Sequence, residues 1–376
     1  MRVTLERSTL LSSLSHVHRV VERRNTIPIL SNVLLVAEND ELHLKATDLD
    51  LEVFEKTSAR VEQPGSTTVP AHMLYEIVRK LQDGSEVMLS IDEGGSILNL
   101  TSGRSQFTLQ ILPASDFPDI TAGEFSHTFS MPAKSIKGLI EHTQFAISTE
   151  ETRYYLNGIY MHTVEADEED GGNLVIRAVA TDGHRLARAQ IEAPSGSEGM
   201  PGIIIPRKAV GEILKLVEDP DANVAVELSD SKIRLTVGEV ILTSKLIDGT
   251  FPDYNRVIPS GNDRELVMDR QSFSRAVDRV STISSDRGRA VKLQLEEGQL
   301  TLSVSNPESG TAEEELPVGY QSEPMEIGFN SKYLLDITNQ LSGEEAIFML
   351  ADSGSPTLIR DSTDNGAIYV LMPMRV

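Results

Sequence analysis

Short segments of this chain recur farther along it at one fixed spacing, and this repetition most limits how the chain can fold. The segment Ala46-Thr-Asp-Leu-Asp-Leu-Glu-Val53 returns as Ala180-Thr-Asp-Gly-His-Arg-Leu-Ala187, and Phe117-Pro-Asp119 returns as Phe251-Pro-Asp253. The offset from position 46 to 180, and from 117 to 251, is 134 residues in both cases. This period is too long for a solenoid unit and suits a whole domain.

A further repeated segment extends the pattern to a third copy. Pro70 and the segment of periodic apolar residues after it match Pro206 and the segment that follows it. A fainter version occupies residues 328–341. The sequence therefore predicts three copies of one domain, at residues 1–125, 126–258 and 259–376. Polar stretches rich in Gly, Pro, Asp or Asn mark the expected boundaries near 121–126 and 259–264.

Composition predicts a cytoplasmic globular protein. The 376 residues are 39 % apolar and 24 % charged, they contain no cysteine, and no run approaches the length of a membrane-spanning helix. The first seven residues alternate in character like a strand and lack the apolar core of a signal peptide. Without cysteine, disulfides, thiolate nucleophiles and Cys-based metal sites are excluded.

Charge is segregated between expected helices and the rest of the chain. The formal net charge is −23, yet six candidate helices together carry +7 and the remainder carries −30. The candidate helices are 8–24, 70–82, 134–147, 206–218, 270–280 and 330–341. Basic helices in an acidic protein suit a partner rich in phosphates. The alternative, that helices simply favour Lys and Arg, stays open on this observation alone.

Hydrophobic periodicity predicts an α+β fold with helices on one face of antiparallel sheets. Residues 136, 139, 140 and 143 share one helical face, whereas 232–237 and 299–304 alternate as strands. Hairpin turns are expected at 39–40, 93–95, 229–230 and 296–298. Acidic stretches at 165–172 and 194–202 are read as solvated loops.

The motifs with chemical potential are weak. Asp182 and His184 suit acid–base or metal chemistry, but the repeated segment around Asp48 lacks a histidine, which favours a turn between strands. Asp48-x-Asp50 and 167–170 lack the ligand set of a calcium loop, and no nucleotide, zinc-protease or serine-hydrolase motif is present. No cofactor, metal or catalytic residue is expected.

The carboxyl end, Tyr369-Val-Leu-Met-Pro-Met-Arg-Val376, is unusually apolar. Residues 369–371 suit a buried last strand, and Pro373 predicts that the chain then leaves the sheet, because proline cannot donate to a ladder. The flexible methionines beyond it suit an adaptable groove that receives peptides from several partners.

Four segments together resemble the bacterial sliding clamps, the β subunit of the replicative DNA polymerase III holoenzyme. They are Arg153-Tyr-Tyr-Leu-Asn-Gly158, Ala180–Ala187, Thr243-Ser-Lys-Leu-Ile-Asp-Gly-Thr-Phe-Pro-Asp-Tyr254 and Met372-Pro-Met-Arg375, and the resemblance covers essentially the whole chain. It implies a head-to-tail homodimer, a ring of six similar domains around duplex DNA. Such a ring is a processivity factor without sequence specificity, bound by polymerase and clamp-loader subunits.

The resemblance also assigns residues to three surfaces. The partner-peptide groove would use Leu156, Thr181, Gly183, His184, Arg185, Leu186, Pro252, Arg256, Val257, Asn330, Tyr333, Val370, Met372, Pro373 and Met374. DNA would be contacted by Arg24, Tyr154 and Tyr155, with Arg207 and Lys208 as additions and with His72 and Glu150 at family contact positions. The dimer interface would use Phe107 against Thr282 and Ile283, with Arg104 and Glu314 as an ion pair.

Three departures from the family pattern carry expectations of their own. His72 and Glu150 replace arginine and glutamine, which predicts weak intrinsic DNA affinity. Gly354 and Pro356 predict a differently shaped second subsite of the groove. Gln106 and Gly310 replace a second charged pair, which predicts a less firmly held dimer.

Two other functions remain as alternatives to the clamp. The first is a repeat-built protein-binding scaffold that never encircles DNA. The second is a metal-assisted hydrolase that uses Asp182 and His184. Substituting His184 separates the hydrolase from the clamp, and reversing charge at Arg24 and Lys208 separates the scaffold from it.

Overall fold

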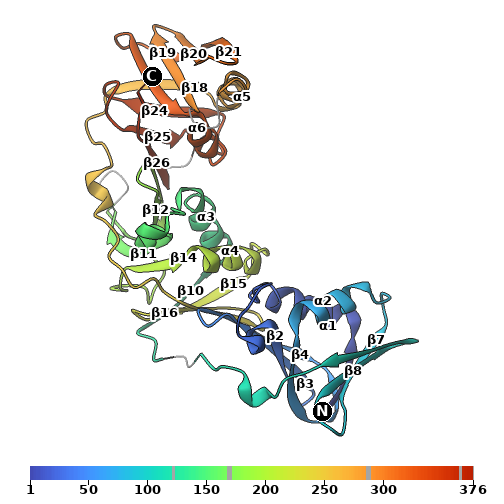
Figure 1. Cartoon of the computed structure of the whole chain (residues 1–376). Helices are drawn as coiled ribbons and strands as arrows, with labels where there is room; N and C mark the ends of the chain where they lie inside the picture. The colour runs from blue at the N-terminus through green and yellow to red at the C-terminus, as the bar shows by residue number, and fades with distance from the viewer. Residues whose placement is uncertain (121–122, 167–171, 285–288, 364–365, 376) are drawn as a thin grey trace. The chain divides into compact units, whose positions relative to one another are not determined.

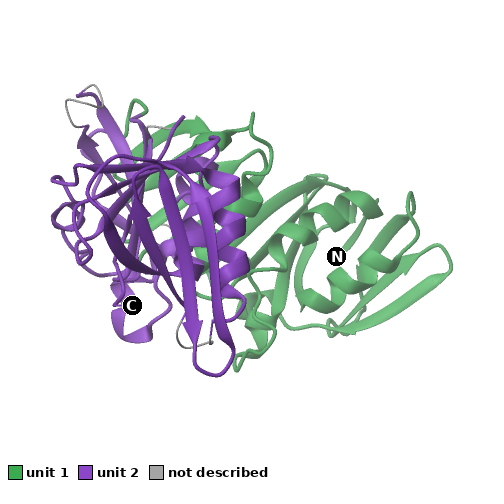
Figure 2. Ribbon diagram, turned by 90° about the horizontal axis from the view of Figure 1, so that it is seen from above, with its two compact units in different colours: residues 1–136, 194–197, 208–246 green, residues 137–193, 198–207, 247–376 purple. Residues whose placement is uncertain are grey.

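The computed structural model of the chain describes residues 1–120, 123–166, 172–284, 289–363 and 366–375. The acidic segment 167–170 and the start of the expected boundary at 121–126 lie outside these ranges. The described chain divides into two compact units (Figure 2). Unit 1 comprises residues 1–136, 194–197 and 208–246, and unit 2 comprises 137–193, 198–207 and 247–376.

Four helices begin and end close to their expected limits, and two are shorter than expected. The α-helices are α1 (Arg7–Val17), α2 (Ala71–Lys80), α3 (Ala133–Glu141), α4 (Arg207–Leu216), α5 (Arg270–Ser281) and α6 (Ser331–Thr338). The helix expected at 134–147 ends at Glu141, so Thr143 lies beyond it, and a separate 3-10 helix follows at Gln144–Ala146. The expected helix at 8–24 ends at Val17, so Arg24 lies in a turn. The buried side chains of α1 are Leu10, Ser13, Leu14 and Val17, and this stripe has no continuation beyond Val21, because residues 22–24 are exposed.

Unit 1 contains two antiparallel sheets. The order β5-β1-β7-β8-β9 uses β5 (Arg60–Gln63), β1 (Arg2–Glu6), β7 (Glu86–Ile91), β8 (Ile97–Ser102) and β9 (Ser105–Gln110). The order β10-β15-β16-β17-β4-β3-β2-β6 uses β10 (His127–Pro132), β15 (Asn223–Leu228), β16 (Lys232–Val237), β17 (Val240–Lys245), β4 (Leu51–Ser58), β3 (Glu41–Thr47), β2 (Asn32–Glu38) and β6 (Gly65–Pro70). Helices α1 and α2 pack side by side on these strands (Figure 1).

Unit 2 repeats this plan. The order β14-β11-β12-β13-β26-β25-β24-β18-β22 uses β14 (Ile203–Pro206), β11 (Gly158–Glu165), β12 (Leu174–Thr181), β13 (Arg185–Glu192), β26 (Ala367–Leu371), β25 (Thr357–Asp361), β24 (Glu345–Leu350), β18 (Arg264–Asp269) and β22 (Gly319–Tyr320). The order β21-β20-β19-β23 uses β21 (Gly310–Pro317), β20 (Gln299–Asn306), β19 (Ala290–Glu296) and β23 (Met325–Asn330). Helices α5 and α6 pack together like α1 and α2 (Figure 1).

Sequence repeats and sheet continuity divide the chain differently. Strand β17 of the second repeat pairs antiparallel with β4 of the first, with Ser244 opposite Leu51. Strand β26 of the third repeat pairs in the same way with β13 of the second, with Leu371 opposite Arg185. Each sheet therefore continues across an expected junction between repeats, and the second repeat contributes strands to both units.

The expected turns form as hairpins between adjacent strands. A two-residue turn joins β2 to β3, where Asn39 and Asp40 both adopt positive φ, at 51° and 56°. Positive φ at two successive positions is characteristic of the type I′ turn, which matches the twist of a hairpin. The turns at 93–95, 229–230 and 296–298 likewise separate paired strands.

Asp361, the last residue of β25, is a buried carboxylate that accepts hydrogen bonds from the backbone. The N–H groups of Ser342, Gly343 and Thr363 all donate to it. Burial alone would raise the pKa of Asp361, but the donated hydrogen bonds outweigh burial and lower the pKa from 3.8 to about 2. A depressed pKa of this kind contributes stability above pH 3.8, which is lost as pH falls through about 2.

We expect Asp361→Asn to lower the free energy of unfolding by about 1–3 kcal/mol at pH 7, because the charged acceptor is lost. The difference from the original protein should shrink as pH falls from 4 towards 2. Urea unfolding at pH 7 and pH 3 measures both effects. Glu345→Gln, on an exposed position of β24, is the control and should change stability by less than about 0.5 kcal/mol. An equal loss at both pH values would mean that shape, and not charge, matters at Asp361.

Candidate functional site

An apolar groove of 180 Å³ opens on unit 2, where β12, β13 and β26 meet the segment 251–257. Nine of its lining residues were expected there: Leu156, Thr181, Gly183, Arg185, Leu186, Pro252, Val257, Val370 and Met372. Phe251, Asp253 and Tyr254 line it as well and were missed. The repeated Phe-Pro-Asp triplet was the available signal for two of these three.

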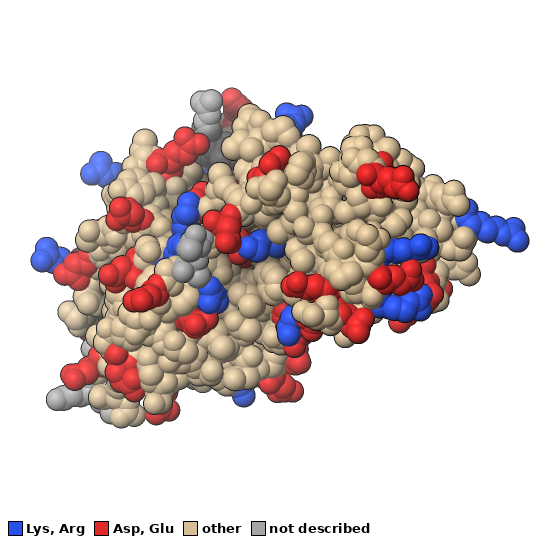
Figure 3. All heavy atoms as spheres, turned by 90° about the horizontal axis from the view of Figure 1, so that it is seen from below, with Lys and Arg blue, Asp and Glu red and all other residues tan. Residues whose placement is uncertain are grey.

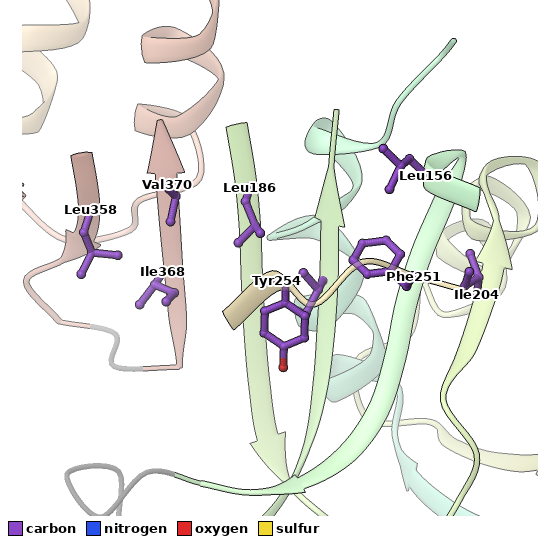
Figure 4. Close-up of a cluster of buried hydrophobic side chains, with 9 residues drawn as sticks. Leu156, Leu186, Ile204, Phe251, Tyr254, Leu358, Ile368 and Val370 are labelled. Carbon is purple, nitrogen blue, oxygen red and sulfur yellow. The ribbon is translucent and has the colours of Figure 1, made fainter. Parts of the chain in front are cut away.

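The floor of the groove is a hydrophobic cluster. Figure 4 shows Leu186, Tyr254, Leu358, Ile368 and Val370 converging from strands and loops that lie far apart in the sequence. Phe251 is also part of the cluster and stacks on Tyr160 with ring centroids 4.9 Å apart. The floor is thus preformed, and an apolar ligand would bury its surface against packed side chains.

One wall of the groove is the turn between β12 and β13, which is held by hydrogen bonds from its own residues. The Thr181 hydroxyl donates to the Arg185 carbonyl at 2.7 Å, and the Asp182 carboxylate accepts from the N–H groups of His184 and Arg185. Gly183 has φ +87°, and a Cβ there would lie 2.7 Å from Nη1 of Arg153. The turn therefore favours glycine at this position.

The equivalent turn of the first repeat uses the same bonds. The Thr47 hydroxyl donates to the Leu51 carbonyl at 2.9 Å, and Asp48 accepts from the N–H groups of residues 50 and 51. Leu49 occupies the position of Gly183 and also has positive φ, at 81°. Because the bonds recur without a histidine, the Thr-Asp pair is explained by turn formation in both repeats.

Arg185 connects this turn to α6. Its guanidinium donates to Asp182 at 3.1 Å, to Asp336 at 2.6 Å and to the Phe145 carbonyl at 2.7 Å. The guanidinium also lies over the rings of Tyr333 and Phe145, 4.2 and 5.0 Å from their centroids. Arg185 is 8 % exposed, so the groove wall contains a buried cation that is fully engaged.

The other expected groove residues lie around the groove without lining it. His184 is exposed and stacks on Tyr333, and Arg256 pairs with Asp253 at 3.0 Å. Asn330 caps α6 by accepting from the N–H groups of Lys332 and Tyr333. Met374 leaves the sheet of β26 and bridges to Gly328 of β23, so Pro373 does mark the departure of the chain. Gly354 and Pro356 lie between β24 and β25.

The residues expected at DNA fall on both units and have different environments. In unit 1, Arg24 is exposed, His72 bonds the Val21 carbonyl, and Lys208 is paired with Glu22 and Asp48. In unit 2, Glu150 is paired with Arg153, Arg207 is exposed, and Tyr154 is 54 % exposed and packs edge-on against half-buried Tyr155. On the face drawn in Figure 3, Lys and Arg side chains lie among Asp and Glu side chains.

The residues expected at the dimer interface also divide between the units. Arg104 and half-buried Phe107 line a hollow of 600 Å³ in unit 1, beside the end of α2. In unit 2, exposed Thr282 and half-buried Ile283 follow α5. The Glu314 carboxylate is already paired within the chain by Arg279, at 2.9 Å from Nε, and this bond lowers the pKa of Glu314.

Two observations concern metals and membranes. The described part of the chain has no group of three or more His, Asp or Glu side chains placed to bind a metal. Among the same residues, none of the helices is both long enough and apolar enough to span a bilayer.

Comparison with known proteins gives one consistent family. Models of the DNA polymerase III beta subunit match residues 1–121 with its N-terminal domain, 130–253 with its central domain and 255–375 with its C-terminal domain. The chain is 52 % identical to the beta sliding clamp of Caulobacter vibrioides and 40 % identical to that of Escherichia coli, with all of each chain covered.

Solved structures agree with this. The sliding clamp of Bartonella birtlesii, bound to griselimycin, is 60 % identical and superposes with a TM-score of 0.96 over all of both chains. The Caulobacter crescentus clamp is 52 % identical with a TM-score of 0.97, over all of this chain and 99 % of the other.

We expect Arg185→Leu to destabilise unit 2 by about 3–5 kcal/mol, because it leaves partly buried carboxylates without their cation. Arg256→Leu is the matched control. It also removes an ion pair, with Asp253 at 3.0 Å, but the Arg256 side chain is 83 % exposed, and a loss below about 1 kcal/mol is expected. Amide hydrogen exchange across β13 and β26 measures both. Similar protection in the two variants would show that Arg185 contributes no more than a surface pair.

Proposed function

Because the chain belongs to the DNA polymerase III beta subunit family, we propose that it is a replicative sliding clamp. In this proposal two copies join head to tail in a ring around duplex DNA and tether the polymerase and other replication and repair factors. The ring is a non-catalytic processivity factor of the cytoplasm, without a cofactor. Each chain contributes three domains, at residues 1–125, 126–258 and 259–376.

Sheet topology is the observation that carries the proposal. Two junctions between repeats are made by equivalent antiparallel strand pairs. They are β17 with β4 and β26 with β13. The third equivalent pair would be β9 with β21, and within the chain each of these is an edge strand. Pairing β9 of one copy with β21 of another completes the series. Because that contact uses different surfaces on the two copies, it is heterologous and closes into a ring when the rotation allows.

Charge at the two edges supports this pairing. Strand β21 carries Glu313, Glu314 and Glu315, whereas Lys80 and Arg104 lie at the hollow beside β9. Phe107 of β9 offers an apolar contact for Ile283, which the Asn306 amide anchors by donating to the Ile283 carbonyl at 2.8 Å. Complementary charge orients association and contributes little affinity where it is exposed.

DNA binding in this proposal depends on diffuse attraction. The six helices carry a net +7 against −30 for the rest of the chain. Contacts to phosphates carry no sequence information, so a ring held by them slides. Arg24, Tyr154, Tyr155 and Arg207 are exposed or half-buried and suit such contacts, whereas His72, Glu150 and Lys208 are engaged within the chain.

The groove on unit 2 suits short apolar peptides from the polymerase and the clamp loader. Its floor is apolar, and its rim adds the flexible side chain of Met372, which is 40 % exposed. The hydrolase alternative finds little support, because the Asp182 carboxylate is occupied by two backbone N–H groups and by Arg185. His184→Ala should therefore weaken the binding of the partner peptide. No hydrolytic turnover should be lost with it.

Topological retention tests the ring. We expect the protein, loaded on nicked circular DNA by the cognate clamp loader and ATP, to stay on the circle and to leave rapidly after a single cut. Gel filtration of DNA-bound protein before and after cutting measures retention. Equal retention on both forms would mean ordinary surface binding and would remove the ring mechanism. No retention on either, with the loader active on a control clamp, would favour the scaffold.

A charge placed in the groove tests partner binding. Val257 lines the groove and is 47 % exposed, so Val257→Asp should preserve the fold. The substitution should weaken the binding of an apolar partner peptide by about tenfold or more, because the bound peptide would desolvate the aspartate without giving it a hydrogen-bond partner. Ile27→Asp is the control, since Ile27 is 46 % exposed outside the groove. Calorimetric titration with the peptide measures both, and equal affinities would place the partner elsewhere.

A further inference from the structure

The turn that follows α1, residues 18–24, contains two buried valines and three exposed arginines. Val20 and Val21 are 0 and 3 % exposed, whereas Arg19, Arg23 and Arg24 are exposed. Within the described part of the chain, none of these three arginines has a carboxylate within 4 Å. Their charges are therefore available to a ligand.

His72 of α2 holds this turn from one side. Its Nε2 lies 2.8 Å from the Val21 carbonyl, and because a carbonyl only accepts, Nε2 carries the proton and donates it. The His72 ring packs edge-on against His18 at 5.6 Å, and His18 stacks on Tyr75 at 3.8 Å. The Nε2–H group of His72 is thus engaged by the Val21 carbonyl and is not free to donate to a phosphate.

Lys208 of α4 holds the same turn from the other side. Its ammonium donates to the Val20 carbonyl at 3.1 Å and to Asp48 at 2.5 Å, and it also pairs with Glu22. Burial alone would lower the pKa of Lys208, but the bonds to Asp48 and Glu22 outweigh burial and raise it, so the side chain stays charged. One cation with two carboxylates makes a group of net charge −1, which does not attract a phosphate.

We propose, on the basis of the sliding-clamp function above, that His72 and Lys208 are positioning residues that hold the turn 18–24 for Arg23 and Arg24 to contact DNA phosphates. They act through backbone carbonyls of adjacent residues, Val20 and Val21. In this arrangement the histidine at position 72 contributes through the turn that it fixes, which carries more positive charge than the histidine would supply itself.

A double-mutant cycle on DNA affinity tests the proposal. His72→Phe removes the donor without changing charge, and Lys208→Met combined with Asp48→Asn removes the lysine at constant net charge. The amide introduced by Asp48→Asn keeps an oxygen that can accept from the turn at 48–51. Each change should weaken binding to a fluorescent primed duplex by about threefold to tenfold, the value of one or two hydrogen bonds. In an Arg23→Ala/Arg24→Ala background, the same changes should cost less than about twofold.

Two further variants separate positioning from general damage. His72→Gln retains a side-chain N–H and should return affinity to within about twofold of the original. Lys215→Met with Glu212→Gln makes the same change of charge on α4, where Lys215 bonds Glu212 at 2.6 Å, and should leave DNA affinity unchanged. Amide exchange at residues 19–24 should accelerate in His72→Phe and not in His72→Gln, with exchange elsewhere in unit 1 unaltered.

Losses of the same size in the Arg23→Ala/Arg24→Ala background would overturn the proposal and make His72 and Lys208 direct contacts. Unchanged DNA affinity on removing His72 and Lys208 would also overturn it. Failure of the clamp function has a different signature, because the original protein would then not be retained on the nicked circle, whereas the exchange rates of residues 19–24 would still report whether His72 holds the turn.

Discussion

The antiparallel pairing of one strand with its counterpart in the next repeat is the interaction on which the rest of this structure depends. It joins β4 to β17 and β13 to β26 and makes each sheet continuous across a junction. The apolar groove follows from the second pairing, because its floor is built from side chains of β13, β25, β26 and the segment 251–257. The unpaired edges β9 and β21 follow from the absence of a third pairing within the described chain.

The second junction carries the apolar groove, and the side chains around the first junction are of a different kind. At the first junction Lys45 pairs with Asp119 at 3.0 Å, and Lys245 pairs with Asp50 at 3.0 Å. At the second, Asp253 pairs with exposed Arg256, and Met372, the residue after β26, aligns with Lys245, the last residue of β17. Ion pairs therefore surround the first junction, whereas apolar side chains line the second. Replication of a domain thus need not replicate the side chains at its junctions.

Much of this was predictable from the sequence because repeats and hydrophobic periodicity are local signals. The buried stripe at Ile136, Leu139 and Ile140, the hairpins, and the helix starts after Pro70 and Pro206 all match the structure. The helices at 8–24 and 134–147 were predicted too long, since charge and periodicity say little about where α1 and α3 stop. The hydrogen bonds that Lys208 and His72 make within the chain were also not predictable, because their partners Asp48 and Val21 lie 160 and 51 residues away in the sequence.

In the ring proposed above, β9 and β21 would act as complementary sheet edges of one chain, which has a consequence for how the protein behaves at high concentration. A chain with a donor edge and an acceptor edge is a monomer unit for polymerisation, since each added copy leaves one edge of each kind free. Ring closure is then what stops growth, by consuming both remaining edges at once. A substitution that alters the angle at a junction, without touching either edge, would convert a closed assembly into an open filament. In the proposed ring, the β4–β17 and β13–β26 pairings would set the angles on which assembly size depends.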